Sequence, residues 1–365
     1  MTTKPSFSTT ICILGCGGFI GSHLVERILG ATDWRIFGID RNPSKISEHL
    51  ANPKFTYANI NIESSAAVEE YIRKSDAVVS LVALCNPSLY NTIPIEVIKS
   101  NFTRPLEIVE RCAALKKWLI HFSTCEVYGS TVSHNAHMPF NSATDIFREE
   151  TTPFVLGPLR AQRWTYACAK QLLERAIYAY GFERGLAYTI VRPFNFIGPR
   201  MDFLPGIDGE GVPRVLACFM DALLSQKPLK LVDGGRNRRT FTAIADAVDA
   251  VMAILAQPHH AQGRIFNIGN PDNETTIAGL AKTMIALYRE LRPEFADFPY
   301  VTQAVTSSEF YGEGYEDSDR RVPDITLAKK LLGWAPALPL DDVLRTTMAF
   351  YIREYAGAHA VREAI

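Results

Sequence analysis

The sequence predicts a doubly wound α/β fold, in which helices cover both faces of a parallel sheet and a smaller lobe follows. Two observations support this prediction. Over the first half of the chain, short apolar, β-branched runs alternate with segments of helical periodicity, a pattern typical of parallel strands joined by helices. After residue 192 the alternation stops, and stretches rich in Gly and Pro separate irregularly spaced elements.

The elements are expected in the following order. Candidate strands of continuous apolar residues are 11–14, 35–39, 55–58, 77–84, 118–122 and 187–191. Helical patterns end near residue 29 and cover 97–115 and 162–180, and residues 138–159 are expected to form a surface loop. Because crossovers between parallel strands are right-handed, the sheet is doubly wound. We assign residues 1–191 to this domain and 192–365 mostly to a substrate-binding α/β lobe interleaved with its last elements.

The composition excludes several classes of protein. The 365 residues are 47% hydrophobic and 21% charged, with a formal net charge of −1, so no nucleic-acid or membrane partner is expected. The first residues lack the apolar stretch of a secretory signal, and no apolar run is long enough to span a bilayer. The seven cysteines are scattered without metal-site spacing. We therefore expect no metal and a reduced, cytoplasmic protein.

A glycine-rich turn, GCGGFIG at 15–21, follows the first strand and opens the first helix. Gly15 permits a tight turn, Gly18 lets the backbone approach a pyrophosphate, and Gly21 allows close helix–strand packing. The helix start, at Phe19 and Ile20, offers N–H donors and a positive dipole end to the phosphates. The turn therefore predicts a dinucleotide site of the Rossmann type.

Asp40 stands at the end of the second strand and is placed to accept hydrogen bonds from ribose hydroxyls. This position favours NAD over NADP. Arg41 could instead hold a 2′-phosphate, but the carboxylate of Asp40 would repel that group. We therefore expect NAD as the cofactor of the first domain.

Tyr166 and Lys170 lie one helical turn apart after the long loop, and Thr124 follows a buried strand. A tyrosine hydroxyl can take an alcohol proton beside a hydride acceptor, but its pKa near 10 must fall first. A lysine ammonium and a positive nicotinamide would lower it. Lys170 can also bind the nicotinamide ribose, and Thr124 can donate to the substrate oxygen. The alternative, a non-catalytic NAD-binding protein, usually lacks the Tyr/Lys pair.

This set resembles the catalytic group of extended short-chain dehydrogenases. The stretches STCEVYG at 123–129 and RPFN at 192–195 resemble the sugar-nucleotide epimerase/decarboxylase branch. QRWTYACAKQLLER, VRPFNFIGPRMDFLPGIDG, EGVPRVLACF and YGEGYEDSDRRVPD are similar to the UDP-apiose/UDP-xylose synthase family. The similarity runs from about residue 10 to about 355, although the loop at 206–211 looks shorter than in the plant members.

The resemblance implies an NAD-dependent enzyme that acts on UDP-glucuronate. Tyr166 would take the C4 hydroxyl proton as NAD accepts the C4 hydride, and loss of the carboxylate would give an enolate held by Tyr166 and Thr124. Re-reduction of the 4-keto-pentose gives UDP-xylose. Retro-aldol cleavage of C2–C3, ring contraction and reduction give UDP-apiose, and NAD is regenerated. The alternative is a UDP-xylose synthase, or a decarboxylase that releases the 4-keto-pentose.

The resemblance also supplies acid–base candidates around C2 and C3 of the sugar. These are Glu126 and the thiols of Cys85 and Cys125, since a thiol can shuttle protons near neutrality if its pKa falls modestly. Two inert core cysteines, and a glutamate that braces the strand end, are the structural alternatives.

Three further charged residues are expected at the sugar. Arg163 and Arg321 could hold the sugar carboxylate by bidentate pairing, or at least one of them could orient Glu126. Asp317 would position Arg321 or a thiol. The structural alternative is that all three form plain surface ion pairs.

The remaining assignments concern binding and assembly. We expect Asn195, Arg214, Lys230 and Arg239 at the UDP moiety, Tyr90 and Tyr315 near the sugar, Asn61 and Ile62 at the adenine, and Leu81 and Ala83 along the middle of the cofactor. A diphosphate favours Arg and Lys, although Lys230 and Arg239 could equally be solvated residues. A homodimer through the helices at 97–115 and 162–180 is expected by analogy.

Overall fold

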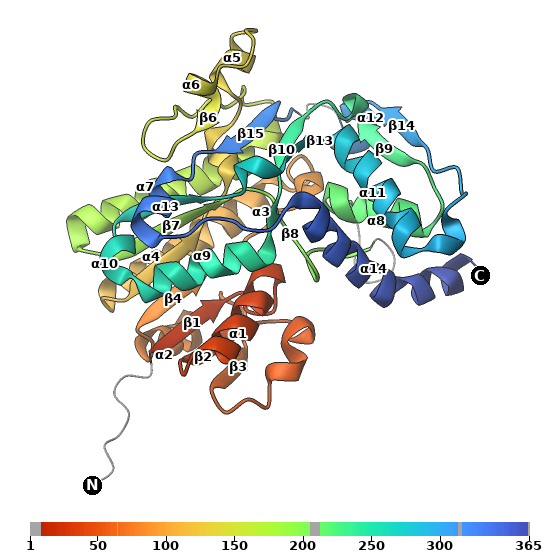
Figure 1. Ribbon diagram of the computed structural model, residues 1–365. Coiled ribbons are helices and arrows are strands. Elements are labelled where there is room, and N and C mark those ends of the chain that lie inside the picture. The colour runs from red at the N-terminus through yellow and green to blue at the C-terminus, as the bar shows by residue number, and fades with distance from the viewer. Residues whose placement is uncertain (1–8, 64, 205–211, 313–315, 364–365) are drawn as a thin grey trace.

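The computed structural model describes residues 9–63, 65–204, 212–312 and 316–363. Its larger part is a seven-stranded parallel sheet in the order β12-β7-β5-β4-β1-β2-β3 (Figure 1). The order reverses between β1 and β4, which creates a crevice at the carboxyl ends of the strands. The predicted doubly wound fold is therefore confirmed. The strands are β1 (Thr10–Leu14), β2 (Arg35–Asp40), β3 (Phe55–Asn59), β4 (Ala77–Ser80), β5 (Trp118–Phe122), β7 (Tyr188–Pro193) and β12 (Arg264–Ile268).

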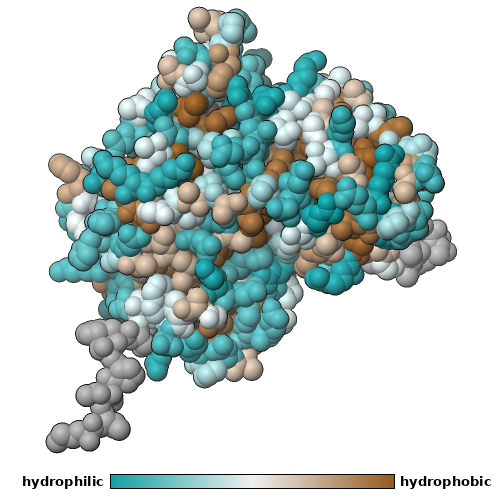
Figure 2. Space-filling view, viewed as in Figure 1, coloured by the Kyte–Doolittle hydropathy of each residue, from teal (hydrophilic) through white to brown (hydrophobic). Residues whose placement is uncertain are grey.

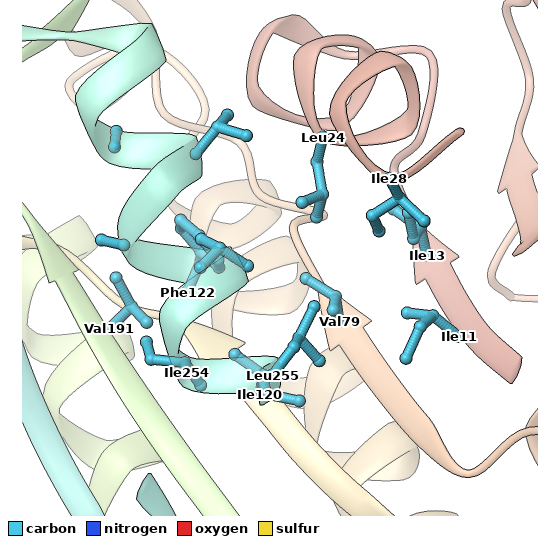
Figure 3. Packing of buried hydrophobic residues seen from close by; sticks show 14 of the residues in the cluster. Ile11, Ile13, Leu24, Ile28, Val79, Ile120, Phe122, Val191, Ile254 and Leu255 are labelled. Atoms are coloured by element: carbon cyan, nitrogen blue, oxygen red, sulfur yellow. The ribbon is translucent and has the colours of Figure 1, made fainter. Parts of the chain in front are cut away.

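Helices cover both faces of this sheet. One face packs on α1 (Phe19–Ala31), α9 (Ile244–Ala256) and α13 (Thr326–Leu332). Figure 3 shows Leu24 and Ile28 of α1 and Ile254 of α9 directed at strand residues such as Val79 and Ile120. The other face packs on α2 (Ser65–Arg73), α4 (Arg104–Ala114) and α7 (Thr165–Arg184). Both faces of the strands are thus buried, which explains their continuous apolar runs.

The predicted helix at 97–115 is interrupted. It consists of α3 (Pro94–Ile98), a π-helical turn at Lys99–Thr103 and α4. Pro105 in the first turn of α4 has no N–H to continue the regular pattern. Asn101 in the π turn accepts from Leu84 N at 3.2 Å and donates to Leu84 O at 3.0 Å. The irregular turn therefore holds the loop that follows β4.

The loop predicted at 138–159 contains regular structure. Within it lie α6 (Ser142–Asp145) and β6 (Ile146–Phe147), and β6 pairs in parallel with β15 (Arg320–Pro323). The expectation of an irregular surface loop is therefore wrong over these residues, because a partner strand from far along the chain completes the pairing. The candidate strand at 77–84 is also shorter than predicted and ends at Ser80.

The smaller part has its own core beneath α8 (Val215–Leu224), α11 (Ile277–Leu291) and α14 (Leu340–Glu363). A four-stranded sheet in the order β13-β10-β15-β6 and two strand pairs, β11-β8 and β14-β9, accompany it. The predicted division at residue 191 stays a prediction, and α9 and β12 beyond it pack in the large sheet's layers. The remaining elements are α5 (Val132–Asn135), α10 (Pro258–Ala261), α12 (Ser307–Tyr311), β8 (Phe196–Ile197), β9 (Leu229–Val232), β10 (Arg238–Thr240), β11 (Thr242–Ala243), β13 (Glu274–Thr276) and β14 (Thr302–Val305).

The face of the molecule seen in Figure 2 is mostly polar. Figure 2 shows hydrophilic side chains over much of the visible face, with small hydrophobic areas between them. Among the described helices, none combines the length and the apolar character needed to cross a membrane.

Candidate active site

The glycine-rich turn joins β1 to α1 at the carboxyl edge of the large sheet. Gly15 has a φ of +90°, and its N–H donates to Ile39 O at 2.8 Å. A Cβ on Gly21 would lie 2.1 Å from the Gly15 carbonyl oxygen, so only glycine permits this packing of α1. The helix start, at Phe19 and Ile20, therefore directs its positive end over the sheet edge.

The other predicted cofactor residues gather at the same edge. Gly18 is the N-cap of α1, and Asp40 ends β2 with its carboxylate accepting from Gly17 N at 3.0 Å. Asp40 thus lies directly against the turn. The segments just beyond β3 and β4 supply the rest, Asn61, Ile62, Leu81 and Ala83.

Thr124, Tyr166 and Lys170 lie together where β5 meets α7, and all three are buried. Thr124 shares a hydrogen bond with Tyr166, and its Oγ1 accepts from Glu126 N at 3.1 Å. Lys170 Nζ donates to the Phe122 carbonyl oxygen at 2.9 Å. The predicted triad is therefore brought together by a strand end and one helical turn.

Burial governs the protonation of this group. It raises the pKa of Tyr166 well above 10, Cys85 and Glu126 raise it further, and the Thr124 hydrogen bond offsets only part of the rise. Burial also lowers the pKa of Lys170 to about 8. Desolvation of the phenolate therefore outweighs the nearby charges of the protein itself, and the predicted lowering of the tyrosine pKa by Lys170 together with a positive nicotinamide stays a prediction.

Tyr90 covers the ring of Tyr166. The two rings are stacked with centroids 5.0 Å apart and planes 10° apart, and Tyr90 is 1% exposed. The guanidinium carbon of Arg163 lies 5.2 Å from the Tyr90 ring centroid. Tyr90, predicted near the sugar, thus links Tyr166 to a group of charged side chains.

That group, the charged cluster, consists of two carboxylates and three guanidiniums. Glu126 pairs with Arg163 and, at 3.3 Å, with Arg321. Asp317 pairs with Arg239 at 2.6 Å, Arg321 at 2.7 Å and Arg163 at 3.6 Å. The arginines are 2–6% exposed, so the alternative of surface ion pairs is wrong. The cluster carries one positive charge in excess.

The arginines control the protonation of both carboxylates. Burial raises the pKa of Glu126, but Arg163 and Arg321 more than compensate and hold it below its usual range. Burial also raises the pKa of Asp317, but the three paired arginines lower it to about 2. Both carboxylates are therefore ionised near neutrality. Of the two roles expected for Arg163 and Arg321, the structure shows the pairing that orients Glu126.

The two thiols lie in different environments. Cys85 is exposed, whereas Cys125 is 3% exposed within a small apolar cluster. Burial raises the pKa of Cys125 to about 11, although Arg321 acts in the opposite direction. A modest fall in pKa is the condition for a thiol to shuttle protons near neutrality, and Cys125 does not meet it here, because its apolar surroundings disfavour the thiolate. Cys125 is a proton donor rather than a base near neutrality.

A pocket of about 1180 Å³ connects the charged cluster to the smaller part. One end is lined by Cys85, Glu126, Arg163, Asp317 and Arg321. The other end includes the start of α8 and strand β9, with the predicted residues Asn195, Arg214 and Lys230 in the lining. Arg239 also lines the pocket but belongs to the charged cluster. A pocket of this size with few polar groups at each end is typical of a small-molecule site.

Arg214 is the N-cap of α8 and is fixed in place by Asp202. The Asp202 carboxylate accepts from Arg214 Nε at 3.2 Å and from its backbone N–H at 2.9 Å. The guanidinium and the positive end of α8 therefore act on the same side of the pocket. Lys230 lines the pocket, whereas Arg239 is buried and paired with Asp317 instead of solvated. Tyr315 and the loop at 206–211 lie outside the described residues.

Comparison with known proteins identifies the family. Residues 11–269 match the model of the NAD dependent epimerase/dehydratase family. The chain belongs to this family. It is 47% identical to UDP-D-apiose/UDP-D-xylose synthase 1 of Arabidopsis thaliana, over 97% of this chain and 94% of the relative. It is 46% identical to UDP-D-apiose/UDP-D-xylose synthase of Oryza sativa subsp. japonica, over 97% and 92%. The resemblance read from the sequence motifs is confirmed.

Two solved structures share the fold. PbgP3 protein from Burkholderia pseudomallei superposes with a TM-score of 0.83 at 33% identity, over 97% of this chain and 98% of that chain. UDP-glucuronic acid 4-epimerase from Bacillus cereus, in complex with UDP-glucuronic acid and NAD, gives a TM-score of 0.77 at 21% identity, over 95% and 100%.

The epimerase/dehydratase family is NAD dependent, and this chain's residues fit that cofactor. The β1–α1 turn leaves no room for a Cβ at Gly21, and a Cβ on Gly17 would lie 1.9 Å from Asn42 O. Such a cradle allows a pyrophosphate close to the backbone. Asp40 is placed for ribose hydroxyls, and Lys170 lies one turn from Tyr166. The NAD prediction therefore agrees with the family and with the geometry.

Sequence reasoning missed several residues of this family's candidate site. Lys227 and Arg236 also line the pocket, as do Trp164 and Glu316. The Gly-Val-Pro-Arg stretch at 211–214 before an apolar run is a breaker signal followed by a helical pattern, and so could have identified the start of α8. No local pattern indicates that Glu316 meets Trp164, since 152 residues separate them.

Proposed function

We propose that this protein converts UDP-glucuronate to UDP-apiose, with UDP-xylose as co-product. The observation that carries the proposal is the pocket itself. Its sugar end combines a carboxylate, a thiol and a cationic cluster beside Tyr166, and its other end offers Arg214, Lys230 and a helix N-terminus to a diphosphate. The full-length similarity to plant UDP-apiose/UDP-xylose synthases supports the same substrate.

In the proposed reaction, Tyr166 takes the proton of the C4 hydroxyl and Thr124 donates to the C4 oxygen. Bound NAD supplies a reversible hydride acceptor, whose positive ring also favours the tyrosinate. After oxidation the carboxylate is β to a ketone, so the C–C bond electrons released with carbon dioxide flow into the C4 oxygen. Tyr166 and Thr124 hold that oxygen by hydrogen bonds, and protonation of the enolate at C5 then gives the 4-keto-pentose.

Ring contraction requires a base at the C2 hydroxyl and an acid nearby. Glu126 is ionised and lines the pocket, so we assign it the base role. When it removes the C2 hydroxyl proton, the C2–C3 bond breaks and its electrons form the C3–C4 enediolate. Cys125 holds its proton and Cys85 faces the pocket, so the thiols act as proton donors during reclosure through C4. Both thiols must stay reduced to act in this way. The proposal therefore includes a location in the cytosol, a reducing compartment.

Product analysis tests this function. The protein incubated with UDP-glucuronate and NAD should release carbon dioxide and give both a branched and an unbranched UDP-pentose by NMR. Cys85→Ala and Cys125→Ser should suppress the branched product more than C4 oxidation, and Tyr166→Phe should suppress carbon dioxide release. Release of only UDP-xylose or of the 4-keto-pentose would establish the alternative single-product enzyme. Unchanged carbon dioxide release by Tyr166→Phe would overturn the chemistry.

We also propose that the protein is a homodimer through α3, α4 and α7. These helices pack together and carry exposed hydrophobic side chains, including Ile95 at 70%, Leu172 at 49% and Phe182 at 85%. Large exposed apolar groups concentrated on adjacent helices are typical of an interface. Light scattering after size-exclusion chromatography should give twice the chain mass, and Phe182→Asp should give the monomer.

A further inference from the structure

Trp164 and Glu316 connect the two segments that carry most of the charged cluster. Trp164 Nε1 donates to Glu316 Oε2 at 3.0 Å. The indole is 3% exposed, whereas Glu316 is exposed. In the chain, Trp164 directly follows Arg163 and Glu316 directly precedes Asp317. This side-chain hydrogen bond therefore links two segments of the chain, one next to Arg163 and the other next to Asp317.

Gly157 lies against this hydrogen bond. A Cβ there would lie 2.4 Å from Glu316 Oε2 and 2.4 Å from Trp164 Nε1. A methyl group cannot fit at that separation, so any larger residue would force the indole and the carboxylate apart. All three residues line the sugar end of the pocket.

Separation of these two segments would change the ion pairs of Glu126 within the charged cluster. Glu126 is held from one side by Arg163, next to Trp164, and from the other side by Arg321, five residues beyond Glu316. Asp317 pairs with both arginines. If the two segments separate, Glu126 loses one arginine and its pKa rises, because burial is then less fully compensated.

We propose that Trp164 and Glu316 are positioning residues that set how Glu126 is paired at the sugar, and so determine how often the ring contracts. The role in ring contraction rests on the function proposed above. Thr124 follows β5, and Tyr166 lies in the first turn of α7, whose N-cap is Trp164. Neither residue takes part in the Trp164–Glu316 hydrogen bond, so proton removal at C4 should depend less on it than the pairing of Glu126 does. The UDP end, at Arg214 and α8, does not depend on it.

Substitutions can separate this role from a general folding defect. Glu316→Ala and Trp164→Phe each remove the hydrogen bond, Gly157→Ala pushes its partners apart, and Glu316→Gln keeps an acceptor. Glu290→Ala is the matched control, because Glu290 also joins two elements, α11 and α14, through Arg345 at 2.7 Å. The first three variants should lower the branched-to-unbranched product ratio roughly 3- to 10-fold, the effect of one lost hydrogen bond.

Four accompanying results are expected. The KM for UDP-glucuronate should stay within about 2-fold of wild type, Glu316→Gln should restore the product ratio, and the double variant Trp164→Phe/Glu316→Ala should match the single variants. The apparent pKa in the pH profile of the branched product should move upward in Glu316→Ala. Additive losses, failure of Glu316→Gln to restore the ratio, or an equal effect of Glu290→Ala would overturn the proposal.

An NMR measurement tests the hydrogen bond without reference to products. The chain has four tryptophans, so Trp164→Phe identifies one indole N–H signal. Glu316→Ala should shift that signal by more than Glu316→Gln does, and Glu290→Ala should leave it in place. If wild-type protein makes no branched sugar, the proposed function fails. The positioning role is then judged by this signal and by the pH profile of carbon dioxide release, and no change in either would overturn it.

Discussion

Replacing the buried lysine of the triad should stabilise the protein while it abolishes activity. Lys170 is 1% exposed, and burial lowers its pKa from near 10.5 to about 8. Since one pKa unit corresponds to about 1.4 kcal/mol, the buried ammonium costs about 3 kcal/mol at pH 7. Lys170→Met removes that cost and loses the hydrogen bond to Phe122 O, worth about 1 kcal/mol. The expected net gain at pH 7 is about 2 kcal/mol.

The difference in stability between Lys170→Met and the wild type should depend on pH. Below pH 8 the lysine is charged in both folded and unfolded protein, so the full cost is present. Between about pH 8 and 10.5 the unfolded state binds more protons, so the stability of the wild type rises with pH. Above pH 10.5 the lysine is neutral in both states and the cost disappears. The advantage of Lys170→Met should therefore be largest near pH 7 and lost by about pH 10.5.

Urea unfolding followed by circular dichroism at pH 7, 8.5 and 10 measures this difference. Lys282→Met, at an exposed position of α11, is the matched control and should show little change at any pH. Release of carbon dioxide from UDP-glucuronate should fall to background in Lys170→Met and not in the control. A Lys170→Met variant that is no more stable at pH 7, or whose advantage persists at pH 10, would refute the reasoning.

Three further outcomes follow from the buried groups. Iodoacetamide at pH 7.5 should modify exposed Cys85 at least about 10-fold faster than Cys125, whose pKa is raised to about 11. Peptide mass spectrometry measures both rates, and similar rates would contradict the burial argument. Glu174→Gln leaves Arg192 without the carboxylate that it meets at 2.6 Å, so the free energy of unfolding should fall by about 3–5 kcal/mol, and a loss below about 1 kcal/mol would count against this. Asp317→Asn should lower the free energy of unfolding by about 2 kcal/mol at pH 7, because the Asp317 pKa is held at about 2 in the folded protein. That contribution is present above pH 4 and is lost as the pH falls through 2. A difference in stability from wild type that persists at pH 2 would disprove the prediction.

Much of the large sheet could be predicted because its signals are local. The five strands up to β5 follow continuous apolar runs, and 118–122 was predicted with its observed bounds. The glycine turn and the Tyr166/Lys170 spacing also depend on neighbouring residues alone. By contrast, β6 forms only because β15 pairs with it. Its two residues carry no periodicity that would distinguish them from a loop.

The charged cluster shows the limit of sequence reasoning. Arg239 is expected at the UDP from the sequence, and the structure shows in addition that it pairs with Asp317, 78 residues away. The register of β10 and β15, which places Arg239 opposite Arg321, brings it there. Such pairings depend on how strands from separate segments align, and the spacing of charges along the chain does not contain that information. The raised pKa of Cys125 was missed for the same reason, since burial of a loop residue is a tertiary property.

The uneven charge of the cluster bears on which sugars the pocket accepts. Three guanidiniums face two carboxylates in a site with little access to water, and an uncompensated buried charge is costly. A uronate brings the missing negative charge with it, whereas the corresponding neutral hexose leaves the imbalance in place. We therefore expect the pocket to favour the uronate over the neutral hexose, two sugars that differ only at C6, through the charge balance of the occupied site.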